Sequence, residues 1–184
     1  VLDEADRMLD MGFSRDVDRI LALVPRKRQN LMFSATMPKA IGELANQMLH
    51  RPVEVDISPE APTTNRIEQY IAFVQKADKR QLLIDLIEGQ MVACGIVFTR
   101  TKHGANRLAK QLSKVGIPSD SIHGDKSQTA RTRALNAFRN GDVFILVATD
   151  IASRGIDVED ITHVFNFDLP NEPEVYIHRI GRTA

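Results

Sequence analysis

The sequence predicts an α/β fold in which parallel β-sheets are flanked by helices. Short apolar runs alternate with segments of helical periodicity, and this order favours right-handed β-α-β units. Residues 143–148 are six consecutive apolar residues, as expected of a strand covered on both faces. Small polar or charged residues follow several predicted strands, at the edge where open parallel sheets bind ligands. The same residue types also cap helices, so each position has a structural alternative.

The first part of the chain predicts a strand, a helix and a second strand. Residues 31–33 form a short apolar run, and Pro38 then begins a helix. The apolar residues of this helix recur at amphipathic spacing; they are Ile41, Leu44, Ala45, Met48 and Leu49. Alternating apolar residues over 53–57 predict another strand. Residues 58–65 are polar, contain two prolines and show no periodicity, which is typical of a linker.

The alternation resumes after this linker and continues to the end of the chain. Strands are predicted over 67–74, 96–98, 119–122, 143–148 and 161–167. Helices are predicted around Leu82–Ile87, through Ala105, Leu108, Ala109 and Leu112, and from about Ser127 to Arg139. The pattern therefore predicts one α/β unit on each side of the linker, with a ligand-binding edge on each.

Composition excludes several classes of protein. The chain has 184 residues, of which 43% are hydrophobic and 26% charged, values typical of a globular protein. No apolar run reaches the roughly 18 residues of a membrane-spanning helix, so we expect no membrane partner. The single Cys94 excludes a disulfide framework and a cysteine-rich zinc site, and it favours a reducing cytoplasm.

Charge is unevenly distributed along a chain whose net charge is zero. Residues 99–139 carry nine basic and two acidic side chains, a local charge of +7. Such a cluster is a candidate surface for phosphate-rich partners, and a solvated basic helix face is the structural alternative.

Adjacent carboxylates lie where the first apolar residues of the chain give way to a helix. Asp3, Glu4 and Asp6 follow Leu2 within four positions. One such carboxylate can hold Mg²⁺ while the next orients or deprotonates an attacking water. Acidic residues in a first helical turn also complement the helix dipole, which is the structural alternative.

Three further groups of residues are candidate phosphate or nucleotide contacts. Gly155 permits close approach of a ligand to the backbone, and Asp157 is a short acceptor suited to a ribose hydroxyl, although a glycine turn with a solvated aspartate is equally simple. Arg179 and Arg182 are three residues apart and would share one face if a helix persists through them. They suit a triphosphate, or the basic end of a helix.

The start of the predicted helix at 127–139 is the third group. Gln128 and Arg131 follow residues 124–127 within the basic segment. A helix N-terminus with a nearby arginine is suited to a phosphate backbone, whereas capping by Ser127 needs no ligand.

Four ordered motifs together resemble those of DEAD-box ATP-dependent RNA helicases. They are VLDEADRMLDMGF at residues 1–13, SAT at 34–36, ATDIASRGID at 148–157 and HRIGR at 178–182. They occur in the family's order and spacing, and the resemblance covers essentially the whole chain. The residues within these motifs are most similar to those of the bacterial RhlE-like group.

This resemblance implies two RecA-like domains, with ATP in the cleft between them and RNA across both. Asp3 would hold Mg²⁺ through water, Glu4 would position or activate the attacking water, and Arg182 would act as an arginine finger. Gly155 and Asp157 would contact the ribose. The residues implied to couple ATP to RNA are Asp6, Ser34, Thr36, His178 and Arg179. The residues implied to hold the RNA backbone are Thr99, Gly124, Gln128, Arg131 and Thr149.

The sequence also departs from the family pattern. It contains no G-x-x-x-x-G-K-[ST] phosphate-binding loop. We therefore expect a piece of a longer helicase, comprising part of a first domain over 1–62 and a truncated second domain over 63–184, that does not hydrolyse ATP alone. The alternatives are a non-catalytic RNA-binding or adaptor module and a DNA-directed helicase of related fold.

Overall fold

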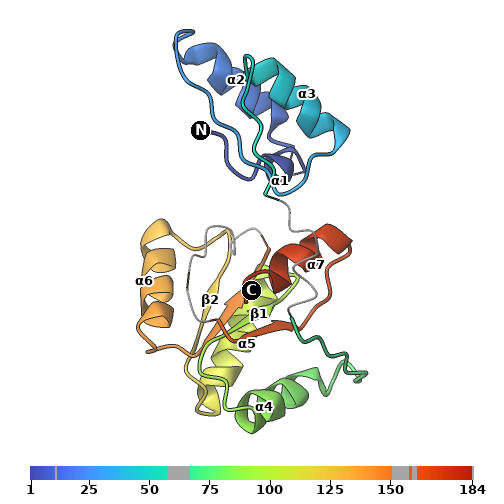
Figure 1. Ribbon diagram of the computed structural model, residues 1–184. Coiled ribbons are helices and arrows are strands. Elements are labelled where there is room, and N and C mark those ends of the chain that lie inside the picture. The colour runs from blue at the N-terminus through green and yellow to red at the C-terminus, as the bar shows by residue number, and fades with distance from the viewer. Residues whose placement is uncertain (11, 58–66, 151–157, 159–160, 184) are drawn as a thin grey trace. The chain divides into compact units, whose positions relative to one another are not determined.

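The computed structural model describes residues 1–10, 12–57, 67–150, 158 and 161–183 (Figure 1). The chain divides into two compact units, Val1–Ser58 and Pro59–Ala184. The domain boundary predicted after residue 62 stays a prediction.

The first unit contains three helices, α1 (Ala5–Asp10), α2 (Ser14–Leu23) and α3 (Lys39–Met48). The periodicity predicted for α3 is confirmed, because Ile41, Leu44 and Met48 are buried. Pro38 directly precedes α3, where its fixed φ suits a helix start. Helix α2 lies in a stretch for which the sequence analysis made no prediction, and its one buried residue is Val17.

Two strands predicted in the first unit do not form among its described residues. The strand expected over 31–33 is reduced to a single parallel bridge between Leu2 and Met32. The alternating residues Val53, Val55 and Ile57 lie outside any strand and are 79–90% exposed. A strand requires a neighbour to accept its hydrogen bonds, and residues 53–57 pair with no described segment.

The second unit is built on a four-stranded parallel sheet. Its strands are β1 (Gly95–Phe98), β2 (Ser119–Ile122), β3 (Ile145–Ala148) and β4 (His163–Asn166), in the order β2-β3-β1-β4. Gly95 pairs with Ile145 on one side of β1 and with His163 on the other. The predicted α/β class with a parallel sheet flanked by helices is confirmed.

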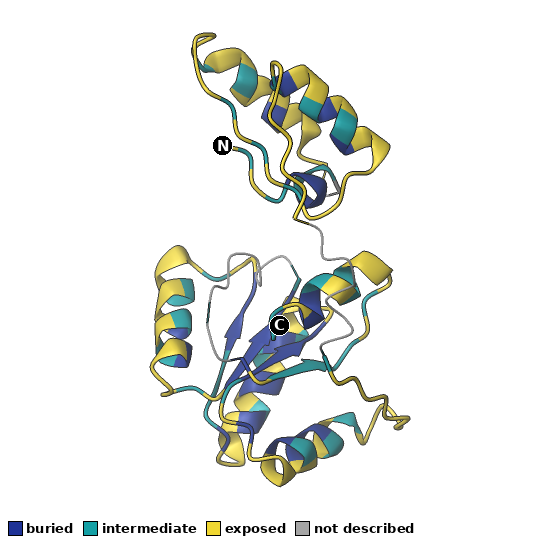
Figure 2. Ribbon diagram, in the orientation of Figure 1, coloured by how far each residue is buried: buried dark blue, intermediate teal, exposed yellow. Residues whose placement is uncertain are grey.

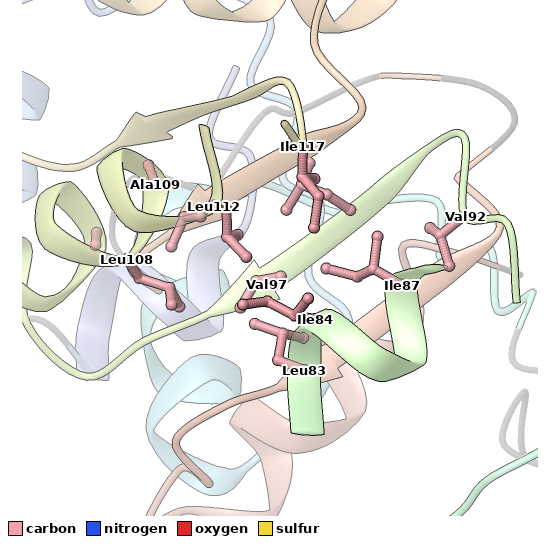
Figure 3. Close-up of a cluster of buried hydrophobic side chains, with 12 residues drawn as sticks. Leu83, Ile84, Ile87, Val92, Val97, Leu108, Ala109, Leu112 and Ile117 are labelled. Atoms are coloured by element: carbon pink, nitrogen blue, oxygen red, sulfur yellow. The ribbon is translucent and has the colours of Figure 1, made fainter. Parts of the chain in front are cut away.

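Helices cover both faces of this sheet. Helices α4 (Lys79–Gly89) and α5 (Lys102–Lys114) pack on the face that presents Val97 and Val147 (Figure 3). Helix α6 (Gln128–Arg139) packs on the opposite face, through Ala134 and Phe138. Helix α7 (Pro173–Ile180) also contacts that face, since Arg179 lies over the ring of Phe98. The central strands are therefore buried on both sides (Figure 2).

Two sequence expectations for the second unit need correction. Residues 67–74 lie outside any strand, and Tyr70, Ile71 and Phe73 are at least 75% exposed. Strand β3 begins at Ile145 instead of residue 143, because Phe144 is 39% exposed and only the last four apolar residues pair with both neighbours. An apolar run indicates which residues can be buried, but it does not supply a pairing partner.

Candidate functional site

Asp6 links the acidic segment of the first unit to residues 34–36. Its Oδ2 accepts hydrogen bonds from the backbone N–H and the hydroxyl of Thr36, both at 2.8 Å. Its own backbone N–H donates to Ser34 Oγ at 3.2 Å, and the Ser34 hydroxyl donates to the Thr36 carbonyl. The structure thus brings together Asp6, Ser34 and Thr36, three residues that the sequence predicted to act jointly.

The local backbone explains how this contact forms. Leu2 and Met32 bridge in parallel, and Ala5 N–H donates to the Phe33 carbonyl at 3.0 Å. The two motifs therefore leave the bridge side by side. Asp6 is only 4% exposed, and burial alone would raise the pKa of its carboxyl. The hydrogen bonds from Thr36 and from the Arg7 N–H outweigh burial and lower that pKa, so Asp6 accepts as a carboxylate.

Glu4 adopts a backbone conformation that is rare for a residue with a side chain. Its φ is 50°, in the left-handed region, and its N–H donates to Asp3 Oδ1 at 2.9 Å. One Glu4 carboxylate oxygen lies 3.5 Å from the guanidinium of Arg7, which is itself buried. Left-handed non-glycine residues cost about 1–3 kcal/mol and concentrate at functional sites. The strained residue here is the one predicted to act on the attacking water.

The chemistry of this acidic segment fits magnesium bound together with phosphate. Among the described residues, no group of three or more His, Cys, Asp or Glu side chains is arranged to hold a metal ion. Asp3 is exposed and offers a single carboxylate. Mg²⁺ is typically held by one or two carboxylates, several waters and the phosphates of a substrate. The residues present therefore fit a nucleotide-borne ion better than a resident one.

Arg179 is the corresponding polar centre of the second unit. Its Nε and Nη2 donate to the two carboxylate oxygens of Asp150 at 2.6 and 2.9 Å. Its Nη1 donates to Asn166 Oδ1 and to the Asp168 carbonyl at 2.8 and 2.7 Å. The guanidinium is 4.8 Å from the ring centroid of Phe98 and is almost fully buried. Arg179 thus ties together segments that follow β3 and β4, over the end of β1.

Arg182 does not share a helix face with Arg179. Helix α7 ends at Ile180, and Gly181 is its C-cap. The helical spacing on which the sequence analysis relied therefore stops before Arg182, which is half-buried in the following turn. The two arginines therefore lie in different surroundings, since Arg179 is internal to the fold and Arg182 lies beyond the helix.

The five residues predicted to hold RNA differ widely in exposure. Thr99 and Thr149 follow β1 and β3 and are buried, whereas Gly124 and Gln128 are exposed and Arg131 is half-buried. Helix α6 begins with Ser127 as its cap, which accepts from Ala130 N–H at 3.3 Å. Ser127 therefore caps the helix, as the structural alternative predicted, and the side chain of Gln128 is exposed at the first helical position.

Gly124 has no intramolecular reason to be a glycine. A Cβ built there meets no atom within 4 Å, and its φ is not in the left-handed region. An alanine would therefore fit the described fold. Close approach of a ligand to the backbone is one physical reason for a glycine at an exposed turn.

His123 follows β2 and is buried without hydrogen-bond partners. It is 5% exposed, and neither ring nitrogen is hydrogen-bonded among the described residues. Burial and the nearby positive charge of Lys126 lower the pKa of its imidazole, which favours the neutral form. His123 directly follows the strand predicted over 119–122, and the sequence analysis assigned it no role.

Sequence reasoning missed two polar residues at the end of β4. Asn166, the last residue of β4, and Asp168 both bind Arg179, and Asp168 Oδ2 also accepts from the Arg100 N–H at 3.0 Å. Asp168 directly follows the predicted strand at 161–167, so the pattern of polar residues after strands indicates it, whereas Asn166 lies within that predicted strand. Gly155 and Asp157, the predicted ribose contacts, lie outside the described residues.

Comparisons with known proteins place these motifs in a family. Residues 1–44 match the family model described as DEAD/DEAH box helicase, and residues 78–184 match the helicase conserved C-terminal domain. The second match covers more than half of the chain. Among the described residues, no helix is long and apolar enough to cross a membrane.

Curated relatives cover the chain from end to end. It is 46% identical over 184 residues to the DEAD-box ATP-dependent RNA helicase CshA of Geobacillus kaustophilus, covering 100% of this chain and 39% of that protein. It is 44% identical over 182 residues to CshA of Streptococcus pneumoniae, covering 99% and 35%. The chain thus spans well under half the length of these relatives. They carry the name CshA, so the narrower RhlE-like assignment stays a prediction.

Solved structures of helicases share the fold. S. cerevisiae Dbp5 bound to RNA and ADP BeF3 is 31% identical with a TM-score of 0.80, over 98% of this chain and 48% of that one. A DEAD box protein from Methanococcus jannaschii is 40% identical with a TM-score of 0.62, over 99% and 49%. These likenesses confirm the RecA-like fold. With its two matching family models, its relatives and its motif geometry, the chain belongs to the DEAD-box ATP-dependent RNA helicase family.

Proposed function

We propose that this chain supplies part of an ATP-dependent RNA helicase, in which hydrolysis of Mg-ATP is coupled to local opening of an RNA duplex. The observation that carries the proposal is the hydrogen bonding between Asp6 and Thr36. It joins the acidic segment suited to nucleotide chemistry to the Ser34–Thr36 segment through a buried carboxylate. A shift of either segment would therefore strain or break these hydrogen bonds and so act on the other segment.

The surroundings of individual residues in the first unit support the roles that the family resemblance implies. Asp3 would hold Mg²⁺ through water, and the ion would neutralise charge on the phosphates of ATP. Glu4, held in a strained conformation beside Arg7, would orient the attacking water and accept its proton. Asp6, Ser34 and Thr36 would transmit the nucleotide state to RNA.

In the second unit, Gly155 and Asp157 would contact the ribose, and Arg182 would stabilise phosphate charge. His178 and the buried Arg179 would belong to the coupling group, with Arg179 setting the positions of the segments that follow β3 and β4. The RNA backbone would be held by the five residues already named, from Thr99 to Thr149. Backbone and 2′-hydroxyl contacts suit a chain that has no Trp and two Tyr to stack on bases.

We infer that the isolated chain does not turn over ATP, because it contains no phosphate-binding loop to anchor the triphosphate. We further infer a cytoplasmic location, from its single cysteine. Protein partners are not assigned.

A chimera tests the proposal. The 184 residues would replace the matching segment of the Geobacillus kaustophilus relative, and ATP turnover would be measured with and without single-stranded RNA. We expect RNA-stimulated turnover that is lost in Glu4→Gln and retained in Glu43→Gln, a matched change at an exposed position of α3. The isolated chain should show no turnover in either condition.

Three results would contradict parts of the proposal. Turnover that persists in Glu4→Gln would remove the role given to Glu4. RNA binding by a chimera without turnover would favour the non-catalytic RNA-binding module. Equal stimulation by RNA and by DNA of the same sequence would favour a DNA-directed helicase, because only RNA offers 2′-hydroxyls.

A further inference from the structure

The outer side of α6 carries a shallow, open hollow, of whose lining residues the proposed roles use only Gln128. It has a volume of about 660 Å³, and its lining comes entirely from α6 and the turn that follows. The polar residues that line it include Gln128, Thr132, Arg133, Asn136, Asn140 and Asp142. Figure 2 shows the exposed side of α6, opposite the residues that pack on the sheet.

Four of these residues form one row along the helix. Gln128, Thr132, Asn136 and Asn140 are spaced by four positions, so each lies beside the next along a ridge that is inclined to the helix axis. The Thr132 hydroxyl donates to the Gln128 carbonyl at 3.0 Å. The three amide side chains are exposed and present N–H donors and carbonyl acceptors along the 12 residues of α6, a length of about 18 Å.

The charge of α6 indicates an anionic ligand. Its sequence, QTARTRALNAFR, contains three arginines and no acidic residue. Arg133 lies within the hollow and is exposed. No large apolar side chain of α6 is exposed, so this face lacks the apolar centre typical of a protein–protein interface. Amides and an arginine on a polar face suit phosphate oxygens and sugar hydroxyls.

The row begins at a residue that is already a candidate RNA contact. Gln128 is the first residue of α6 and the first residue of the row. The row ends beside Asp142, whose negative charge would repel a phosphate. A strand that leaves Gln128 along α6 would therefore meet donors for about the length of the helix and then an acidic boundary.

We propose that a single RNA strand continues past Gln128 along the outer face of α6, where Arg133, Asn136 and Asn140 bind its phosphates and 2′-hydroxyls. This inference rests on the proposed RNA-binding function and extends it to a second, adjoining segment of RNA. It assigns α6 a role in RNA length preference, since only a strand long enough to pass Gln128 gains these contacts.

Two RNAs of different length test the inference. Affinity of the 184-residue chain would be measured by fluorescence anisotropy for oligouridylates of roughly 6 and roughly 15 nucleotides, within the range of known single-strand site sizes. The variants are Arg133→Gln and the double variant Asn136→Ala/Asn140→Ala. The matched control is Arg80→Gln, which removes the same charge from an exposed position on α4.

We expect each α6 variant to weaken binding of the longer RNA by about threefold or more and to leave the shorter RNA unchanged. Arg133→Gln should also reduce the salt dependence of the longer RNA by about 0.7 in log–log slope, the value for one phosphate contact on a single strand. Arg80→Gln should leave both affinities within error of wild type. Far-UV circular dichroism checks that each variant is folded.

The other outcomes overturn the inference in distinguishable ways. Unchanged binding of both RNAs in the α6 variants would rule out an RNA path along α6 while leaving the proposed function intact, and would leave this face to a protein partner. An equal loss of affinity for both RNAs, or an equal effect of Arg80→Gln, would show that the variants act through the overall charge of the chain and would overturn the inference. No binding of either RNA by the wild-type chain would overturn the inference, whereas RNA-stimulated turnover by the chimera would still support the proposed function.

Discussion

The two units of the molecule each hold a buried polar centre, and they support it in different ways. In the first unit, Asp6 gathers donors from residues 34–36 beside a single parallel bridge. In the second, Arg179 lies over Phe98 at the end of a sheet whose central strands are buried on both faces. One centre is a carboxylate that collects neutral donors, and the other is a cation paired with a carboxylate.

This difference indicates how each unit responds to substitution of its polar centre. Apolar clusters on both faces stabilise the sheet of the second unit. Its polar centre is therefore left mainly to position the segments that follow the strands. The described part of the first unit contains no sheet beyond one bridge, so the Asp6 contacts are a larger share of what holds its motifs together. The predictions below test that contrast, from the largest effect to the smallest.

Removal of the Arg179 side chain is expected to have the largest effect. Arg179→Met should lower the free energy of unfolding by about 2–4 kcal/mol, because it removes the hydrogen bonds that Arg179 donates to Asp150 and Asn166. The loss is smaller than for a fully buried pair because the Asp150 side chain is 36% exposed. Urea unfolding followed by far-UV circular dichroism measures it. Arg133→Met, at an exposed position of α6, should change stability by less than about 0.5 kcal/mol. A similar small change in both variants would contradict the central role of Arg179.

Substitution of Asp6 tests the polar centre of the first unit. Asp6→Asn should cost about 1–3 kcal/mol locally, since an amide cannot accept from Thr36 twice and from the Arg7 N–H as a carboxylate does. Hydrogen exchange should show faster exchange of the Thr36 amide, with no change at β1. Asp16→Asn on α2 is the matched control, at an exposed ion pair with Arg19. Unchanged protection at Thr36 would show that the bridge alone holds the two motifs.

Gly124→Ala separates folding from ligand binding within the second unit. Stability should stay within about 0.5 kcal/mol of wild type, because the added Cβ meets open space. RNA affinity should fall by about 1 kcal/mol, or roughly fivefold, if the RNA backbone approaches this turn closely. Gly42→Ala on α3, where a Cβ also meets nothing, should leave RNA affinity unchanged. Wild-type affinity in Gly124→Ala would remove Gly124 from the RNA contacts.

The smallest effect is a pH dependence that arises from His123. Burial and Lys126 lower the pKa of His123 below its ordinary value of 6.5, so the unfolded chain binds a proton more readily than the folded one. Stability from this residue is therefore complete above about pH 6.5 and is lost as the pH falls below it. Urea midpoints measured across this range should show the loss, and His123→Leu should reduce it. His50→Gln, at an exposed histidine of the first unit, should retain the wild-type curve. An unchanged slope in His123→Leu would assign the loss to other groups.

Part of this fold could be read from local pattern. In α5, the four apolar residues predicted from their spacing, Ala105, Leu108, Ala109 and Leu112, are the four buried ones. Helical periodicity is a property of neighbouring residues, and it survives whatever the helix packs against. The strands behaved differently. Residues 53–57 alternate and residues 67–74 are rich in apolar residues, yet most of these side chains are exposed, because pairing depends on a second segment that local pattern does not specify.

The candidate site likewise has features that the sequence predicts and features that only the tertiary structure determines. The motif residues, their order and the residue types suited to nucleotide and RNA were present in the sequence, because chemistry depends on which side chains are available. That Asp6 binds Thr36, 30 positions away, and that Arg179 binds Asp150, Asn166 and Asp168 was decided by the bridge of the first unit and the sheet of the second. The end of α7 before Arg182 and the burial of His123 were likewise tertiary outcomes. Hydrogen bonds require atoms within about 3 Å in a fixed orientation, and only the folded chain supplies that for residues distant in sequence.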